Sequence, residues 1–308
     1  MDVKRFLRYL APNLVTFASL VFGMSSIISS FEGRFVDAAW FIIFSVLTDK
    51  LDGFVARLVK GTSEFGVQLD SFADFLNFGI APATLWYAYL SRPELVTQGA
   101  HRVLTVGAMM LWVLAVTFRL ARYNIVGDDP RCKRIFFGVP TTLMGGMLSG
   151  LFLTFLKYGA EPSGVPIVVV DEPRLLWFLH LGSGVWRYWP ILVGVGALLM
   201  ASAVKIPKLG IAKSKIFTVF IFANVFVGYA MGATRHFPEY LCFAATLWIV
   251  VSIVWGQFNH DARLLHPPPI FPKQDRPAHQ QPQRPEEDLV PDEDEAGHHF
   301  EDTAEHKV

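Results

Sequence analysis

The amino-acid sequence predicts an all-α polytopic membrane protein with about eight transmembrane helices, and three observations support this prediction. First, 52% of the 308 residues are hydrophobic and only 18% are charged, whereas about 25% of the residues of soluble domains are charged. Second, the chain contains eight apolar segments, each near the roughly 20 residues that cross the hydrocarbon core as a helix. Third, Lys and Arg recur in alternate loops, as the positive-inside rule requires.

The eight expected spans follow one another along the chain, and the longest connection between them is 159–186. They cover residues 11–30, 36–58, 67–90, 102–123, 138–158, 187–205, 214–233 and 238–257. Helices are expected because open strands cannot satisfy their backbone groups in lipid. Every second loop is basic and the others are mixed or acidic, so both termini and the loop at 59–66 are predicted to be cytoplasmic. The basic residues that set this direction are Lys4, Arg5, Arg8, Arg57, Lys60, Arg131, Lys133, Arg134, Lys205, Lys208, Lys213 and Lys215.

The composition changes near residue 263, which divides the chain into an expected membrane domain, 1–262, and an expected disordered cytoplasmic tail, 263–308. From His266 onward the chain has 4 Lys/Arg and 11 Asp/Glu, with many Pro and Gln and almost no aromatic residues. Such a segment cannot bury a core. Its five histidines, including the pair His298 and His299, belong either to a solvated tail or to a metal site. Two cysteines exclude a disulfide framework.

Four aspartates interrupt the apolar pattern in the stretch DKLDGFVARLVKGTSEFGVQLDSFAD, residues 49–74. Asp49 and Asp52 are three residues apart at the end of one span, and Asp70 and Asp74 are four apart at the start of the next. Each pair therefore shares one helix face. Because a short turn joins the two spans, the faces can oppose each other, and we expect four carboxylates around one cavity at the cytoplasmic boundary.

Such a cluster is costly without a partner, because carboxylates near the membrane are expensive and close carboxylates repel one another. Mg²⁺ or Mn²⁺ resolves both problems, and two ions could be bridged by this set. Gly53 and Gly66 would let a bulky ligand or backbone approach, and Arg57 can pair with a phosphate. The pattern is that of a phosphoryl-transfer site. The alternative is that the acids pair with nearby basic residues at a wet helix end.

The spacing D-x2-D-G-x2-A-R-x8-G-x3-D-x3-D, from Asp49 to Asp74, resembles the signature of the CDP-alcohol phosphotransferase family at every defined position. The resemblance covers roughly residues 10–260 and implies the helical bundle of that family. It also implies that an incoming alcohol displaces CMP from a CDP-linked lipid. Asp49, Asp52 and Asp70 would be metal ligands, and Asp74 would be a further ligand and the catalytic base. The CDP-lipid pocket would contain Asn13, Thr16, Gly53, Ala56, Arg57 and Gly66, the first two from the motif PNLVT.

The context EFGVQLDSFADFLNFGIAP, together with RLARYN at 119–124 and FFGVP at 136–140, is similar to the bacterial branch of the family that uses serine as the acceptor. This branch implies CDP-diacylglycerol and L-serine as substrates, a multi-pass place in the inner membrane, a homodimer and no nucleic-acid partner. Tyr123, Val139 and Thr142 depart from the usual pattern of that branch, so the acceptor stays open. Arg119, Arg122 and Asn124 would bind a phosphate or the acceptor, or the two arginines would be anchors at the membrane surface.

Other readings of the acids remain. The same chemistry with choline, glycerol phosphate or an inositol phosphate as acceptor is compatible with these residues. A cation transporter is the alternative of a different class, because acids inside membranes also mark ion pathways. That alternative predicts acids spread through the membrane depth and paired repeats with broken helices, whereas here the acids are confined to one hairpin.

Overall fold

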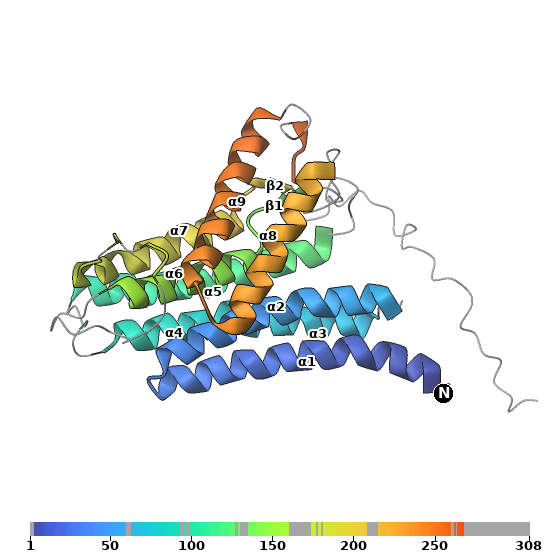
Figure 1. The fold of residues 1–308 in the computed structure, drawn as a ribbon, viewed down its shortest axis with the longest axis horizontal. Helices are drawn as coiled ribbons and strands as arrows, with labels where there is room; N and C mark the ends of the chain where they lie inside the picture. Colours follow the sequence, from blue (N-terminus) through green and yellow to red (C-terminus); the bar gives the residue numbers. More distant parts are fainter. Residues whose placement is uncertain are drawn as a thin grey trace, which may run out of the picture. The chain divides into compact units, whose positions relative to one another are not determined.

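The computed structural model describes residues 3–59, 63–92, 95, 99–126, 129, 135–159, 174–176, 178–179, 181–207, 215–259, 262 and 264–267. Over these residues the chain is almost entirely helical and forms one compact unit, Met1–Pro268. Figure 1 shows its long helices lying side by side. The expected tail lies outside the described residues from 268 onward, so its disorder and its histidines stay predictions.

Each of the eight expected spans coincides with a long helical stretch of the described residues. The stretches are α1 (Val3–Phe31), α2 (Phe35–Val59), α3–η1–α4 (Glu64–Asp74, Phe75–Ile80 and Ala81–Leu90), α5 (Ala100–Val126), α6 (Thr141–Tyr158), η3–α7 (Ser183–Tyr188 and Trp189–Ala201), α8 (Lys215–Thr234) and α9 (Pro238–Phe258). Four of them are long and apolar enough to cross a membrane, namely α1 from Leu10, α5, the η3–α7 stretch from Gly184, and α9. The all-α polytopic membrane class is thus confirmed. The full count of eight spans stays a prediction, because only these four stretches of the described residues meet that measure of length and apolarity.

The packing places the first four helical stretches around the aspartates. Helix α1 packs along α2 and also contacts α3, η1 and α4, while α2 packs against α6. Helix α5 packs against α7, and α9 packs against α6. In Figure 1, α8 and α9 cross the other helices obliquely. The core between them is aromatic, with Trp86, Trp112, Trp189 and Phe152 fully buried.

A short antiparallel ribbon is an element that the apolar pattern did not predict. Strand β1 (Ile135–Phe137) pairs with β2 (Lys205–Pro207), and Phe136 lies opposite Ile206. The sequence analysis had extended two spans to residues 138 and 205, but α6 begins at Thr141 and α7 ends at Ala201. The start of α6 and the end of α7 bring the segments 135–137 and 205–207 together, and these segments pair as strands.

Candidate active site

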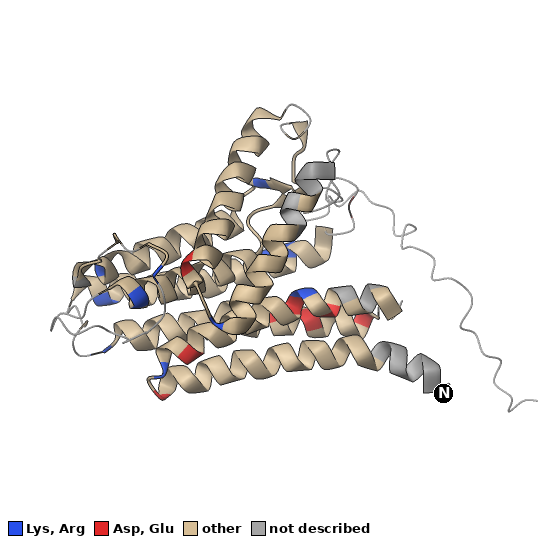
Figure 2. Cartoon of the chain, viewed as in Figure 1, with Lys and Arg blue, Asp and Glu red and all other residues tan. Residues whose placement is uncertain are grey.

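Three of the four predicted aspartates converge between the C-terminal half of α2 and the C-terminal end of α3. One carboxylate oxygen each from Asp49, Asp70 and Asp74 lies within 4.8 Å of the others. Figure 2 shows the acidic residues of α2 and α3 side by side. Carboxylate oxygens at this spacing suit a hard divalent cation. The donor set therefore fits the Mg²⁺ or Mn²⁺ that the sequence pattern predicted.

The fourth aspartate, Asp52, lies one turn after Asp49 on α2 and is 7% exposed. Its Oδ2 accepts a hydrogen bond of 3.1 Å from the hydroxyl of Thr16, which belongs to α1. Asp52 remains within electrostatic reach of Asp70. Thr16 therefore joins α1 to Asp52, and its predicted role in the CDP-lipid pocket stays a prediction.

A cation of the chain itself lies beside the cluster, and sequence reasoning had missed it. The ammonium group of Lys50 is 3.0 Å from Oδ2 of Asp49, whose side chain is 11% exposed. Lys50 also lies within electrostatic reach of Asp74. One positive charge offsets part of the repulsion among the carboxylates. The adjacent letters DK in the motif were the only signal for this contact.

The predicted nucleotide residues lie on α1, α2 and α3 around these acids. A Cβ on Gly66 would lie 3.1 Å from Oδ1 of Asn13, so glycine at this position allows α3 and α1 to approach closely. The Gly66 amide donates a 3.0 Å hydrogen bond to Ser63 Oγ, which caps α3. Gly53 is half-buried on α2. The side chains of Ala56 and Arg57 lie outside the described residues, and only their place on α2 is established.

The two arginines of α5 occupy different environments although both are more than nine-tenths buried. Arg119 donates through Nη1 to the hydroxyl of Thr141 at 2.9 Å, and its Nε has no hydrogen-bond partner in the described structure. It also lies within electrostatic reach of Asp74. Arg122 instead donates to backbone carbonyls at the end of α7 and in β1, namely those of Met200, Ala201, Ser202 and Phe137.

Asn124 follows these arginines at the exposed end of α5. Its amide nitrogen donates a 3.0 Å hydrogen bond to Ser71 Oγ. Ser71 follows Asp70 directly on α3, so Asn124 ties the end of α5 to the helix that carries two of the acids. Arg119, Arg122 and Asn124 of the RLARYN motif therefore make three different sets of contacts. Of these three residues, Arg119 is the one with a hydrogen-bond donor still available.

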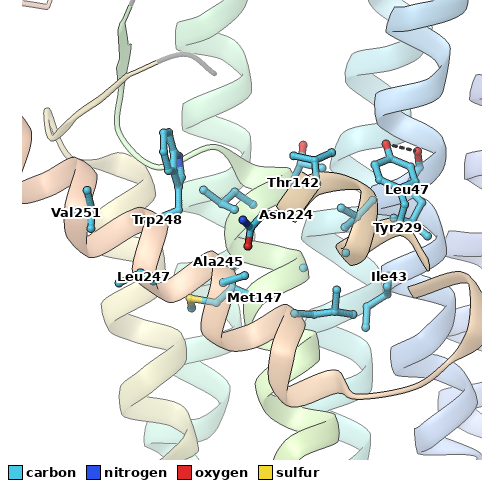
Figure 3. A pocket seen from close by; sticks show the side chains of 17 residues that line it. Ile43, Leu47, Thr142, Met147, Asn224, Tyr229, Ala245, Leu247, Trp248 and Val251 are labelled. Atoms are coloured by element: carbon cyan, nitrogen blue, oxygen red, sulfur yellow. Dashed lines mark hydrogen bonds between the residues drawn. The ribbon is translucent and has the colours of Figure 1, made fainter. Parts of the chain in front are cut away.

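An apolar cavity of about 400 Å³ lies between α2, α6, α8 and α9. Figure 3 shows its lining, which includes Ile43, Met147 and Trp248. Leu47 also lines it, two residues before Asp49, and its carbonyl accepts a 3.2 Å hydrogen bond from the hydroxyl of Tyr229. Tyr229 lies within electrostatic reach of Asp49 and Asp52. The cavity lining therefore includes Leu47, a residue of the helix that carries Asp49 and Asp52.

Comparison with known proteins decides the family. Residues 9–170 match the family model described as CDP-alcohol phosphatidyltransferase, which covers the acidic cluster and more than half of the chain. The chain belongs to this family. The D-x2-D-G-x2-A-R-x8-G-x3-D-x3-D pattern predicted the membership, and the geometry of Asp49, Asp70 and Asp74 agrees with it.

Several relatives carry the same name, CDP-diacylglycerol–serine O-phosphatidyltransferase. The chain is 41% identical to the protein of Helicobacter pylori (strain 26695) over 134 residues, 43% of this chain and 52% of that protein. It is 30% identical to the protein of Mycobacterium tuberculosis (strain H37Rv) over 221 residues, 64% and 71% respectively. It is 28% identical to that of Methanocaldococcus jannaschii over 233 residues, 76% and 92%. The chain thus spans about half the length of the first of these relatives.

The different contacts of the two arginines predict different effects of substitution. Arg119→Gln is expected to lower the rate of CMP release at least tenfold and to change the melting temperature little. The reason is that the Arg119 guanidinium donates to one hydroxyl, that of Thr141, and leaves Nε available for a ligand. Arg122→Gln is expected to lower the melting temperature, since several buried carbonyls lose their donor. CMP release and thermal unfolding of both variants in detergent test this. Equal loss of stability in the two variants would contradict it.

Proposed function

We propose that this chain transfers the phosphatidyl group of CDP-diacylglycerol to the hydroxyl of L-serine, which gives phosphatidylserine and CMP. The observation that carries the proposal is the convergence of Asp49 on α2 with Asp70 and Asp74 on α3, in a chain of the CDP-alcohol phosphatidyltransferase family. The choice of serine as the acceptor is supported by the names of the relatives, which include an archaetidylserine synthase of Methanothermobacter thermautotrophicus.

The aspartates have two tasks in this proposal. Asp49, Asp52, Asp70 and Asp74 would hold one or two Mg²⁺ or Mn²⁺ ions, which neutralise the charge of a pyrophosphate when bound. Asp74 would accept the proton of the serine hydroxyl as the general base. The serine oxygen would form a bond to the phosphorus on the diacylglycerol side, while the bond from that phosphorus to the CMP oxygen breaks in line.

The remaining predicted residues bind and orient the substrates. Asn13, Thr16, Gly53, Ala56, Arg57 and Gly66 would line the nucleotide pocket. Arg119 would hold the serine carboxylate or the lipid phosphate, because it is the buried cation with an available donor beside Asp74. Arg122 could serve there only after leaving the carbonyls it holds, and Asn124 would position α3 through Ser71.

The apolar cavity would accommodate an acyl chain of the donor lipid. It begins at Leu47 and Tyr229 beside the acids and extends between α6, α8 and α9. We therefore expect Ala245→Leu, which fills part of this cavity, to raise KM for CDP-diacylglycerol several-fold and to leave kcat unchanged. Ala223→Leu on the exposed side of α8 is the matched control, with parent kinetics expected. An unchanged KM in Ala245→Leu would contradict the acyl-chain assignment.

We also place the chain in the inner membrane with several passes, as a homodimer, with both termini and the active site cytoplasmic. The support is the alternation of basic loops. Small-residue stretches such as GGMLSG, residues 145–150, suit close helix packing. Labelling of single cysteines placed in the loops at 32–34 and 59–63, from either side of intact vesicles, tests the orientation. Access to both loops from the same side would contradict it.

One experiment tests the reaction. Purified protein in detergent is given CDP-diacylglycerol and Mn²⁺ or Mg²⁺, with serine, choline, glycerol 3-phosphate or an inositol phosphate added separately. CMP release that depends on serine, with phosphatidylserine as the lipid product, is the expected result. Release with another acceptor would keep the donor chemistry and replace the acceptor. A folded, metal-loaded chain that releases no CMP would contradict the proposal and favour the transporter reading.

A further inference from the structure

The helix that carries Asp70 and Asp74 changes its geometry immediately after Asp74. Residues Phe75–Ile80 form a π-helical turn, η1, between α3 and α4, and the amide of Ala81 donates to the carbonyl of Leu76 five residues earlier. Such turns are rare and occur often at functional sites. The sequence analysis expected an uninterrupted helix over 67–90, so this turn is a feature that the apolar pattern had concealed.

Pro82 explains why the turn forms here. Proline has no amide hydrogen, and its ring collides with the carbonyl four residues earlier in an α-helix. That carbonyl belongs to Phe78. It accepts a 2.9 Å hydrogen bond from the indole Nε1 of Trp112 on α5 instead, and both Phe78 and Trp112 are fully buried. The proline removes the backbone partner and the indole replaces it.

A second contact holds the turn from the side of α1. The Asn77 amide nitrogen donates a 2.6 Å hydrogen bond to Ser19 Oγ. The contact is close, because a Cβ on Gly23 would lie only 2.0 Å from Oδ1 of Asn77. Asn77 and Ser19 are both at least 98% buried. The turn is therefore fixed by buried side chains from two neighbouring helices.

The turn has a geometric consequence for the acids. In an uninterrupted α-helix, residues follow one another at about 100°. The buried residues Pro82, Trp86 and Tyr89 of α4 would then face roughly 100° away from Asp70 and Asp74. A π-turn of this length rotates the following helix back by a similar angle. The turn thus allows α4 to bury its apolar face while the acids on α3 face the same interior.

We propose that the π-turn η1, formed at Pro82 and held by Trp112, aims Asp70 and Asp74 of α3 at Asp49 of α2. Pro82 and Trp112 are positioning residues, because they act on Asp74 through the helix and do not touch the acidic cluster. Without the turn, packing of α4 into the core would rotate α3 and carry its carboxylates away from α2. This inference rests on the metal site of the proposed function and extends it to residues outside the family signature.

Binding of Mn²⁺ to the full chain in detergent, followed by the electron paramagnetic resonance signal of the free ion without lipid or serine, tests the inference. Pro82→Ala restores the backbone amide and favours a continuous α-helix. We expect it to weaken Mn²⁺ binding at least tenfold while the melting temperature stays the same or rises. A residue with only a structural role would not separate these two measurements. Mn²⁺ binding within twofold of the parent would overturn the inference.

A matched pair of tryptophans supports the test if Pro82→Ala does not fold. Trp112 and Trp86 are both 0% exposed and contact each other edge to face, but the Trp86 indole nitrogen has no hydrogen-bond partner in the described structure. Trp112→Phe is expected to weaken Mn²⁺ binding about fivefold, and Trp86→Phe less than twofold. An equal effect of both would overturn the inference.

The outcome is separable from that of the proposed function. A parent chain that binds no Mn²⁺ would overturn this inference, because there would be no site to align. A parent chain that binds Mn²⁺ and loses this binding in Pro82→Ala supports the inference even if serine releases no CMP. In that case only the proposed reaction would be wrong.

Discussion

Replacing Asp74 by Asn is expected to lower serine-dependent CMP release by about a thousandfold, within the range of 10²–10⁴ for loss of a general base. The amide cannot accept the hydroxyl proton, and it also replaces one of the three carboxylates whose oxygens lie within 4.8 Å of one another by a neutral group. Binding of CDP-diacylglycerol is expected to stay within a few-fold of the parent, because the nucleotide residues and the apolar cavity are unchanged. Single-turnover CMP release and equilibrium binding of the lipid measure the two effects separately.

Asp37→Asn is the control for this experiment. Asp37 lies on α2, as Asp49 does, but at the opposite end, where it pairs with Arg235 at 2.9 Å. Its loss removes one carboxylate from the same helix without touching the cluster, so activity near that of the parent is expected. An active Asp74→Asn variant would place the base elsewhere. A variant that no longer binds the lipid would show that Asp74 acts mainly by holding the donor.

The acidic cluster was predictable because its causes are local. Spacings of three and four residues place Asp49 with Asp52 and Asp70 with Asp74 on single helix faces. A short turn between two helices then leaves few arrangements other than an antiparallel hairpin. The sequence analysis therefore predicted the helices and the convergence of Asp49, Asp70 and Asp74, whereas the fourth aspartate, Asp52, is hydrogen-bonded to Thr16. The assignments to nucleotide and acceptor remain proposals, because they concern ligands.

The features that escaped prediction depend on contacts between distant residues. Arg119 and Arg122 have the same composition around them in sequence, yet one meets Thr141 and the other meets the carbonyls that follow α7. Pro82 was a local signal for a distortion after Asp74. Pro82 alone did not indicate whether the distortion would be a kink, a helix end or a π-turn. The π-turn depends on Trp112, which lies 30 residues further along the chain. No helical periodicity contains this information.

A second large effect is expected at a buried ion pair between α6 and α9. The Lys157 ammonium lies 3.1 Å from Oε1 of Glu239, and the two side chains are 4% and 2% exposed. The same oxygen accepts hydrogen bonds from the Tyr158 hydroxyl at 2.8 Å and from the Leu175 amide at 3.1 Å. Glu239 therefore joins both helices to the segment that follows α6.

Glu239→Ala is expected to destabilise the chain by about 3–5 kcal/mol, because it breaks a buried ion pair and removes the oxygen that accepts from Tyr158 and Leu175. Lys157→Met is expected to cost less, since Glu239 keeps its bonds to Tyr158 and Leu175. The double variant Lys157→Met with Glu239→Leu should recover most of the loss, because two apolar side chains replace the pair. Denaturant unfolding in detergent measures the stability of all three variants.

Glu32→Ala is the control, because it breaks an ion pair with Arg34 whose side chains are 53% and 51% exposed. It should leave the unfolding midpoint unchanged. A Glu239→Ala variant as stable as this control would mean that water reaches Lys157 between α6 and α9.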